Sequence, residues 1–302
     1  MKKRISTAFV LLMTFYPVCA SDPHSVPGVP PEKALEMLKE GNARFVGEKA
    51  EHPHTKIDRV RDTAVNGQHP FVTMMACSDS RVPLEEIFDQ GVGDIFSIRV
   101  AGNVSGSDEI GSIEYGVVHT GTRLLVVLGH TKCGAVTAAC TGGGHEGNIE
   151  NLMRALQPAV AVTESKTGKR GTEIIPQCCR ENVFVQIENI LKNSKILQES
   201  VKKGELTVVG AIYDIDTGCV EFLGQHPFTA TLANGANGIP ATRPVSMPRS
   251  VQSSYPAPAY RPVPATYSAG SYPVLVTEES SLPGQPQKPR RQGGVRNLLK
   301  RQ

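Results

Sequence analysis

The sequence predicts an α/β domain in which a mainly parallel β-sheet is flanked by helices and preceded by an N-terminal helical arm. Short, almost wholly apolar runs alternate along the chain with longer segments whose apolar residues recur at helical spacing. Apolar runs of this kind are typical of parallel strands that are covered on both faces. Strands that alternate with helices favour an α/β fold over an all-helical or all-strand one.

The first half of the domain shows this alternation clearly. Residues 30–46 open with proline and carry apolar side chains every three or four positions, which predicts the helical arm. The run FVTMMA at 71–76 predicts a strand buried on both faces. A short helix at 83–91, closed by Gly91, then leads to the next strand at 94–101.

The second half repeats the pattern. Residues 108–121 predict a helix, RLLVVLG at 123–129 a buried strand, and CGAVTAAC at 133–140 the start of another helix. Residues 180–204 predict the longest helix. The chain closes with strands at 206–214 and 219–223, separated by IDTG, which indicates a hairpin-like return. Ligands in such sheets bind beyond the carboxyl ends of the strands, so residues directly after a strand are the first functional candidates.

The N-terminal segment differs in composition from the domain. Residues 1–20 begin with basic residues, continue with an apolar run and end with Val18 and Ala20, which is the order found in a secretory signal peptide. The run is too short for a permanent membrane anchor. We therefore expect cleavage near Ala20 and a periplasmic or secreted protein. The alternatives are a buried first helix and a lipoprotein signal with Cys19 as the lipidated residue.

The C-terminal segment, residues 229–302, is predicted to be a disordered, Pro-rich basic tail. It holds half of the chain's 22 prolines, and nine Lys and Arg against two Glu. Such a composition buries little apolar surface. The tail is either a solvated linker or a contact to an anionic surface, and its sequence identifies no partner. The domain at residues 21–228 is acidic, which argues against nucleic-acid binding because phosphate contacts need clustered Lys and Arg.

Three residues with metal-binding side chains follow two of the predicted strands. Cys77 comes directly after one strand, His130 directly after another, and Cys133 three residues later. Two thiolates and one imidazole would give a zinc ion three protein ligands and leave the fourth position open, as in catalytic sites. A structural site would need a fourth ligand, and Cys140 lies two helical turns beyond Cys133, too far to share the ion. We therefore predict one catalytic zinc ion per chain.

Asp79 and Arg81 lie in the same loop as Cys77. In the functional interpretation, Asp79 accepts a hydrogen bond from a zinc-bound water or hydroxide, while Arg81 keeps the carboxylate ionised and oriented. The alternative is an ordinary salt bridge at the surface.

These motifs together resemble those of the β-class carbonic anhydrases. The matching segments are ACSDSRVP, GDIFSIRVAGN, SIEYGVVH, VVLGHTKCGAV, ENVFVQIENI and YDIDTGCVEF, and the resemblance covers about residues 30–224. It implies a β-carbonic anhydrase-like fold and a zinc enzyme that interconverts carbon dioxide and bicarbonate by attack of zinc-bound hydroxide. The two cysteines and the histidine named above match its zinc ligands, and Asp79 and Arg81 match its catalytic dyad.

The resemblance also implies a homodimer or a larger homo-oligomer, because the family builds its active site at a dimer interface. Gln68, Phe96 and Tyr115 match the positions of the substrate-orienting amide and the aromatic pocket walls. Some members close the site by letting the aspartate occupy the fourth zinc position, tied to a pocket that uses tryptophan. The absence of Trp and the presence of Gln68 favour an open site. His119 is a candidate proton relay.

Two other functions fit parts of the pattern. Enzymes that hydrolyse carbonyl sulfide or carbon disulfide share this fold and ligand set, and they differ in loops and tunnel access that motifs do not describe. A non-catalytic zinc or thiol-redox protein would be expected to lack Asp79 or Arg81 and to favour a Cys-x-x-Cys pair, which is absent. The remaining cysteines of the domain, Cys140, Cys178, Cys179 and Cys219, are expected to be buried free thiols, although export would expose them to oxidising conditions.

Overall fold

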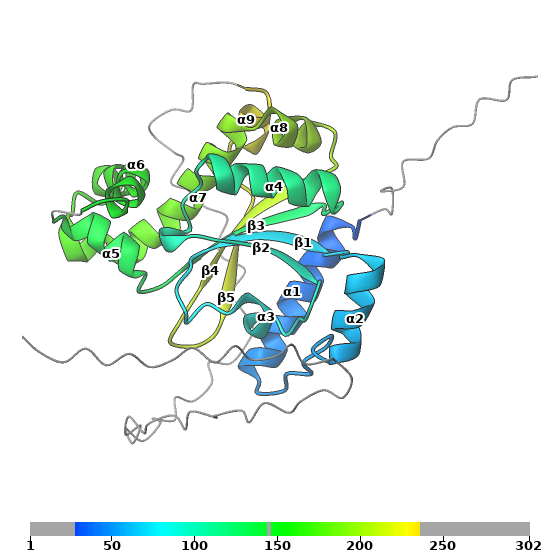
Figure 1. Ribbon diagram of the computed structural model, residues 1–302. Helices are drawn as coiled ribbons and strands as arrows, with labels where there is room; N and C mark the ends of the chain where they lie inside the picture. The colour runs from blue at the N-terminus through cyan, green and yellow to red at the C-terminus, as the bar shows by residue number, and fades with distance from the viewer. Residues whose placement is uncertain (1–27, 144–145, 236–302) are drawn as a thin grey trace, which may run out of the picture. The chain divides into compact units, whose positions relative to one another are not determined.

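The computed structural model describes residues 28–143 and 146–235 of the chain, and these residues contain a five-stranded sheet in the order β2-β1-β3-β4-β5. The first four strands run parallel, and β5 returns antiparallel to β4 (Figure 1). The strands are β1 Val72–Ala76, β2 Ile95–Arg99, β3 Leu124–His130, β4 Thr207–Tyr213 and β5 Val220–Gly224. The predicted mainly parallel sheet flanked by helices is confirmed.

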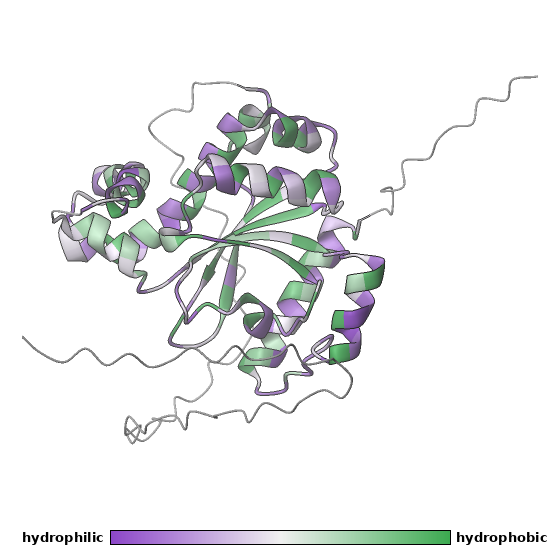
Figure 2. Ribbon diagram, viewed as in Figure 1, coloured by the Kyte–Doolittle hydropathy of each residue, from purple (hydrophilic) through white to green (hydrophobic). Residues whose placement is uncertain are grey.

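Helices cover both faces of this sheet. On one face α1 and α3 pack against alternate residues of β1 and β3, and on the other face α4, α7, α8 and α9 pack against the residues between them. Figure 2 accordingly shows the central strands as mostly hydrophobic along their length. The helices are α1 Pro31–Val46, α2 Ile57–Asn66, α3 Leu84–Ile87, α4 Ser107–His119, α5 Gly134–Thr141, α6 Ile149–Thr167, α7 Ile175–Asn193, α8 Lys195–Lys202 and α9 Thr229–Ala233, with 3-10 turns η1 Ala101–Asn103 and η2 Gly171–Ile174.

The long helix α7 approaches the sheet closely. A Cβ atom at Gly129 or at Gly210 would lie 2.8 or 2.7 Å from a methyl group of Val183, so the side chain of Val183 fits only because both strands carry glycine there. This contact fixes the distance of α7 from β3 and β4, and it places the neighbouring residues of α7 beside the loops that leave the sheet.

One predicted helix is in fact two. The segment 180–204 was expected to be continuous, but Ser194 has an extended backbone, with φ −125° and ψ 106°, and separates α7 from α8. Its hydroxyl accepts a hydrogen bond from the backbone N–H of Leu197 at 3.1 Å. Ser194 is therefore an N-cap that starts a new helix rather than an interior residue. In addition, α7 begins at Ile175, five positions before the predicted start.

The folded part also extends beyond the predicted end of the domain at residue 228. Leu232 and Ala233 of α9 are 1% and 2% exposed, and Leu232 belongs to the same apolar cluster as α7 and α8. The boundary at 228/229 is thus wrong, and the domain reaches at least residue 235. The predicted signal peptide, residues 1–20, and the tail from residue 236 lie outside the described residues. Within the part of the chain that the structure describes, we find no helix long and apolar enough to cross a membrane.

The remaining described cysteines are free thiols. Cys140, Cys178 and Cys179 are buried as expected, whereas Cys219 is only half-buried. Burial raises the pKa of the Cys179 thiol to about 11, which keeps it protonated and unreactive at neutral pH.

Candidate metal centre

Two neighbouring parallel strands and one helix place the three predicted ligands. Strands β1 and β3 pair in parallel, with Ala76 opposite Leu128, so Cys77 and His130 emerge at the same edge of the sheet. Cys133 is the N-cap of α5 and follows the short turn after β3. The carboxyl ends of the strands therefore bring together residues that are far apart in the sequence, as expected for this fold class.

The three side chains form a compact, buried cluster. The Cys77 and Cys133 sulfur atoms are 3.9 Å apart, and all three potential ligand atoms lie within 4.8 Å of one another. Cys77, His130 and Cys133 are 4%, 1% and 1% exposed. Across the described residues this is the one group of three or more His, Cys, Asp or Glu with metal-binding geometry.

His130 is oriented for metal binding. Its Nδ1 is 2.9 Å from the Thr131 carbonyl oxygen, which can only accept, so the ring proton is on Nδ1 and the lone pair is on Nε2. That Nε2 atom is buried and has no hydrogen-bond partner. Buried polar atoms are rarely left unpaired, so a lone pair facing two thiols fits a metal ion well.

The two thiols also favour a metal. The hydrogen bond from the Cys133 thiol lowers the pKa of Cys77 against the opposing effect of burial, helped by the backbone N–H groups of Asp79 and Gly102, while the same pairing raises the pKa of Cys133. One of the two cysteines is therefore readily a thiolate, and a divalent cation would displace the proton of the other.

Asp79 and Arg81 lie at the rim of the cluster. The Arg81 side chain donates from Nε to Asp79 Oδ1 at 2.9 Å and from Nη2 to Oδ2 at 2.7 Å, a two-pronged pairing. These bonds hold the pKa of Asp79 well below its usual range. Asp79 Oδ2 is 4.0 Å from His130 Nε2, so an ionised carboxylate faces the place where a metal would bind.

Arg81 also links the two ligand-bearing loops. Its Nη2 donates to the carbonyl of Lys132 at 3.3 Å, and Lys132 adopts a left-handed backbone with φ 55°. This conformation is uncommon for a residue other than glycine and is often found near functional sites.

Arg99 is a site residue that the sequence reasoning did not single out. From the end of β2 it donates from Nε to the Cys77 carbonyl at 3.0 Å and from Nη2 to the Asp79 carbonyl at 2.6 Å. It thereby supports the backbone of the loop that carries both a ligand and the dyad. The signal that could have identified Arg99 is its position as a basic residue at the end of the strand next to β1.

The predicted substrate-pocket residues lie elsewhere in the same chain. The rings of Phe96 and Tyr115 stack with centroids 5.9 Å apart, and Tyr115 is 52% exposed. Phe96 pairs with Thr73, four residues before Cys77, which separates Phe96 from the cluster by about 13 Å along the strands. Gln68 is exposed and precedes β1. These residues therefore sit at the amino end of the sheet, opposite the cluster.

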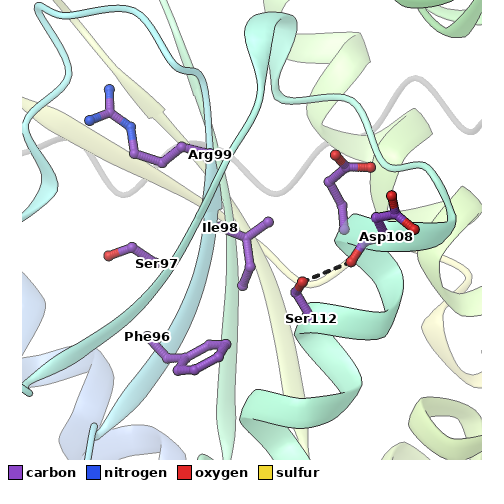
Figure 3. Close-up of a pocket in the computed structure, with 7 residues that line it drawn as sticks. Phe96, Ser97, Ile98, Arg99, Asp108 and Ser112 are labelled. Carbon is purple, nitrogen blue, oxygen red and sulfur yellow. Dashed lines mark hydrogen bonds between the residues drawn. The ribbon is translucent and has the colours of Figure 1, made fainter.

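A pocket of about 320 Å³ lies between β2 and α4. Figure 3 shows Ile98 pointing from β2 towards α4, and Arg99 on the other side of the strand. On the α4 side, the hydroxyl of Ser112 donates to the Asp108 carbonyl at 2.8 Å. Phe96 and Arg99 both line the pocket, so it connects the aromatic pair with the residue that supports the ligand loop.

The fold and the cluster define a class of α/β proteins with a buried Cys–His–Cys metal centre at the carboxyl ends of parallel strands. The family model described as carbonic anhydrase matches residues 72–220. Carbonic anhydrase 2 of Mycobacterium tuberculosis is 36% identical over 198 residues, which cover 64% of this chain and 93% of the relative. A carbonic anhydrase of Mycolicibacterium smegmatis is 33% identical over 200 residues, 65% of this chain and 95% of the relative.

Solved structures agree with this family. The β-carbonic anhydrase CafA of Aspergillus fumigatus superposes with a TM-score of 0.53 at 26% identity, over 69% of this chain and 99% of that one. The Coccomyxa β-carbonic anhydrase, solved in complex with acetazolamide, gives a TM-score of 0.51 at 27% identity, over 63% and 86%. The chain belongs to the β-class carbonic anhydrase family and is an enzyme of that family.

Proposed function

We propose that the chain catalyses the reversible, zinc-dependent hydration of carbon dioxide to bicarbonate and a proton. The observation that carries this proposal is the unpaired, buried Nε2 of His130, which faces two cysteine sulfur atoms, with the ionised Asp79 carboxylate 4.0 Å away. Membership of the carbonic anhydrase family supports the same reaction.

Cys77, His130 and Cys133 would hold one zinc ion per chain. Zinc held there would supply a Lewis acid that lowers the pKa of water towards neutrality, so that hydroxide would be available near neutral pH. Asp79 would accept a hydrogen bond at the substrate side of the site and so orient the attacking oxygen, and Arg81 keeps Asp79 ionised and in place.

The metal assignment is tested by replacing Cys133 with serine, because a hydroxyl is a much poorer ligand for zinc than a thiolate. Cys133→Ser is expected to lose zinc and carbon dioxide hydration together, measured by metal analysis and stopped-flow assay. Cys140→Ser, a buried thiol on the same helix outside the cluster, is the matched control and should keep both. Full zinc occupancy in Cys133→Ser contradicts the assignment. Sulfide release from carbonyl sulfide, measured on the same wild-type sample, separates the proposed reaction from the related hydrolase activity.

The active enzyme is proposed to be a homo-oligomer that completes each site with residues of a second copy. Gln68, Phe96 and Tyr115 lie at the opposite end of the sheet from their own cluster, so within one chain they do not contact it. Mixing two inactive variants tests this. Dissociated and reassociated Cys133→Ser and Phe96→Ala chains are expected to regain part of the wild-type activity, because mixed assemblies combine an intact cluster with an intact aromatic wall. Absence of any recovery in verified mixed assemblies contradicts the proposal.

Export is proposed from the composition of residues 1–20 alone. Sequencing the mature N-terminus of protein from a periplasmic fraction tests it, with a start near Ser21 as the expected result. A full-length chain that is retained in the cytoplasm contradicts it.

A further inference from the structure

A row of amides on α7, two of them buried and one half-buried, faces the segment that follows β2. Asn182, Gln186 and Asn189 are spaced i, i+4 and i+7, so they form one stripe of the helix. Asn182 is 0% exposed and Gln186 is 2% exposed. Burying an amide costs free energy unless its donors and acceptors are paired. The partners of this stripe therefore indicate what it does.

Those partners are groups of η1 and of the loop that joins it to α4. Asn182 Nδ2 donates to the Gly102 carbonyl at 2.8 Å, and Gln186 Nε2 donates to Asn182 Oδ1 at 3.0 Å. Gln186 Oε1 in turn accepts from the N–H and the hydroxyl of Ser105, both at 2.8 Å. A continuous chain of hydrogen bonds thus runs from Ser105 through two amides to Gly102.

Gly102 connects this series of hydrogen bonds to the Cys–His–Cys cluster. Its N–H donates to the sulfur of Cys77 at 3.2 Å. Its φ is 75°, and a Cβ atom there would lie 3.1 Å from Leu156 and 3.2 Å from Ala135, so the backbone is closely packed as well as left-handed. The carbonyl of Gly102 thus accepts a hydrogen bond from Asn182, and its N–H donates one to the Cys77 sulfur.

The geometry points to Asn182 as a positioning residue of the metal centre, which aims the Gly102 N–H at the Cys77 sulfur and so sets the donor strength of that ligand. A hydrogen bond to a thiolate withdraws charge from it and fixes its direction. Asn182 contacts no substrate and acts only through Gly102. The inference rests on the proposed zinc site.

The test compares Asn182→Ala with Asn189→Ala. Asn189 is on the same stripe and donates to the carbonyl and hydroxyl of Ser105 at 2.6 and 2.9 Å, so it anchors the same loop without contacting Gly102. Zinc affinity is measured by chelator competition, and the cobalt-substituted protein is examined by absorption. Asn182→Ala is expected to bind zinc about tenfold more weakly, as for other residues that support metal ligands. Its cobalt–thiolate charge-transfer band is expected at longer wavelength, because the sulfur lone pair rises in energy without the N–H.

Asn182→Leu is the second variant, for use if Asn182→Ala does not fold. Leucine fills nearly the same volume as asparagine and likewise lacks the side-chain N–H donor. Wild-type zinc affinity and an unshifted cobalt band in a folded Asn182 variant overturn the inference while the metal centre stands. Equal changes in Asn189→Ala also overturn it, since they would show a general loosening of the loop. A wild-type chain that binds neither zinc nor cobalt overturns the metal centre and the inference together.

Discussion

At the scale of single residues, the proposed chemistry depends on the Asp79 carboxylate and on the Arg81 guanidinium that holds it. Asp79→Asn keeps the shape of the side chain but removes its charge and offers a donor where an acceptor is needed. We expect hydration to slow by about 10² to 10³, as for the loss of one well-placed electrostatic contact. Zinc should remain bound because Asp79 is not among the three clustered ligands. Stopped-flow rates beside zinc content measure both effects.

The partner residue provides the internal check. Arg81→Ala should behave similarly, and the double variant should lose much less than the product of the two single losses, because the residues act as a unit. An ordinary surface salt bridge contributes at most about 1 kcal/mol and would leave turnover unchanged. A zinc-loaded Asp79→Asn enzyme with the wild-type rate therefore refutes the role of the dyad and leaves the metal centre standing.

At the scale of elements, β2 supports the site through its last residue. Arg99→Ala removes both hydrogen bonds to the carbonyls of Cys77 and Asp79, so the loop should become mobile and zinc should bind roughly tenfold more weakly. Chelator competition measures this. Arg123→Ala is the matched control, because Arg123 makes longer bonds, of 3.4 and 3.5 Å, to loop carbonyls far from the cluster. Unchanged zinc affinity in Arg99→Ala would show that the loop holds its shape without β2.

The burial of individual strands and helices explains which elements the sequence could predict and which it could not. The parallel strands were recognisable because β1 and β3 are buried at every position, which gives unbroken apolar runs. The cluster was recognisable because its ligands follow those runs directly. Helix α2 was not predicted, although Ile57, Val60 and Ala64 recur at helical spacing, and in the structure none of its residues is buried. Helix α6 was also missed, although Met153, Leu156 and Val160 are buried at helical spacing, and its interior Pro158 obscured the pattern.

Contacts made by the backbone were outside the reach of sequence reasoning. The bonds of Arg99 to two carbonyls, and of Asn182 to Gly102, depend on how a loop turns rather than on any side-chain pattern. The distant position of the pocket residues is a property of strand register, which pairs Phe96 with Thr73 rather than with the end of β1. Such register becomes visible only when both strands are placed.

At the scale of the whole molecule, the domain extends at least through α9, and two truncations test the contribution of that helix. A chain that stops at residue 228 loses Leu232, which is 1% exposed and packs with α7 and α8, whereas a chain that stops at residue 235 keeps it. Removing a buried leucine side chain commonly costs about 2 to 5 kcal/mol. Thermal unfolding should therefore show a clearly lower midpoint for the shorter chain and nearly the wild-type midpoint for the longer one.

Turnover is the second measurement on the truncated chains. None of the residues assigned to the site lies after residue 235, so the longer truncation is expected to hydrate carbon dioxide at nearly the wild-type rate. Leu232→Ala in the full-length chain is the point-mutant control, and it should reproduce much of the stability loss of the shorter truncation because it removes the same buried contacts. Equal midpoints for the chains that end at 228 and 235 would show that α9 adds nothing to the core. A large loss of turnover on removal of residues 236–302 would instead assign those residues a part in catalysis or assembly.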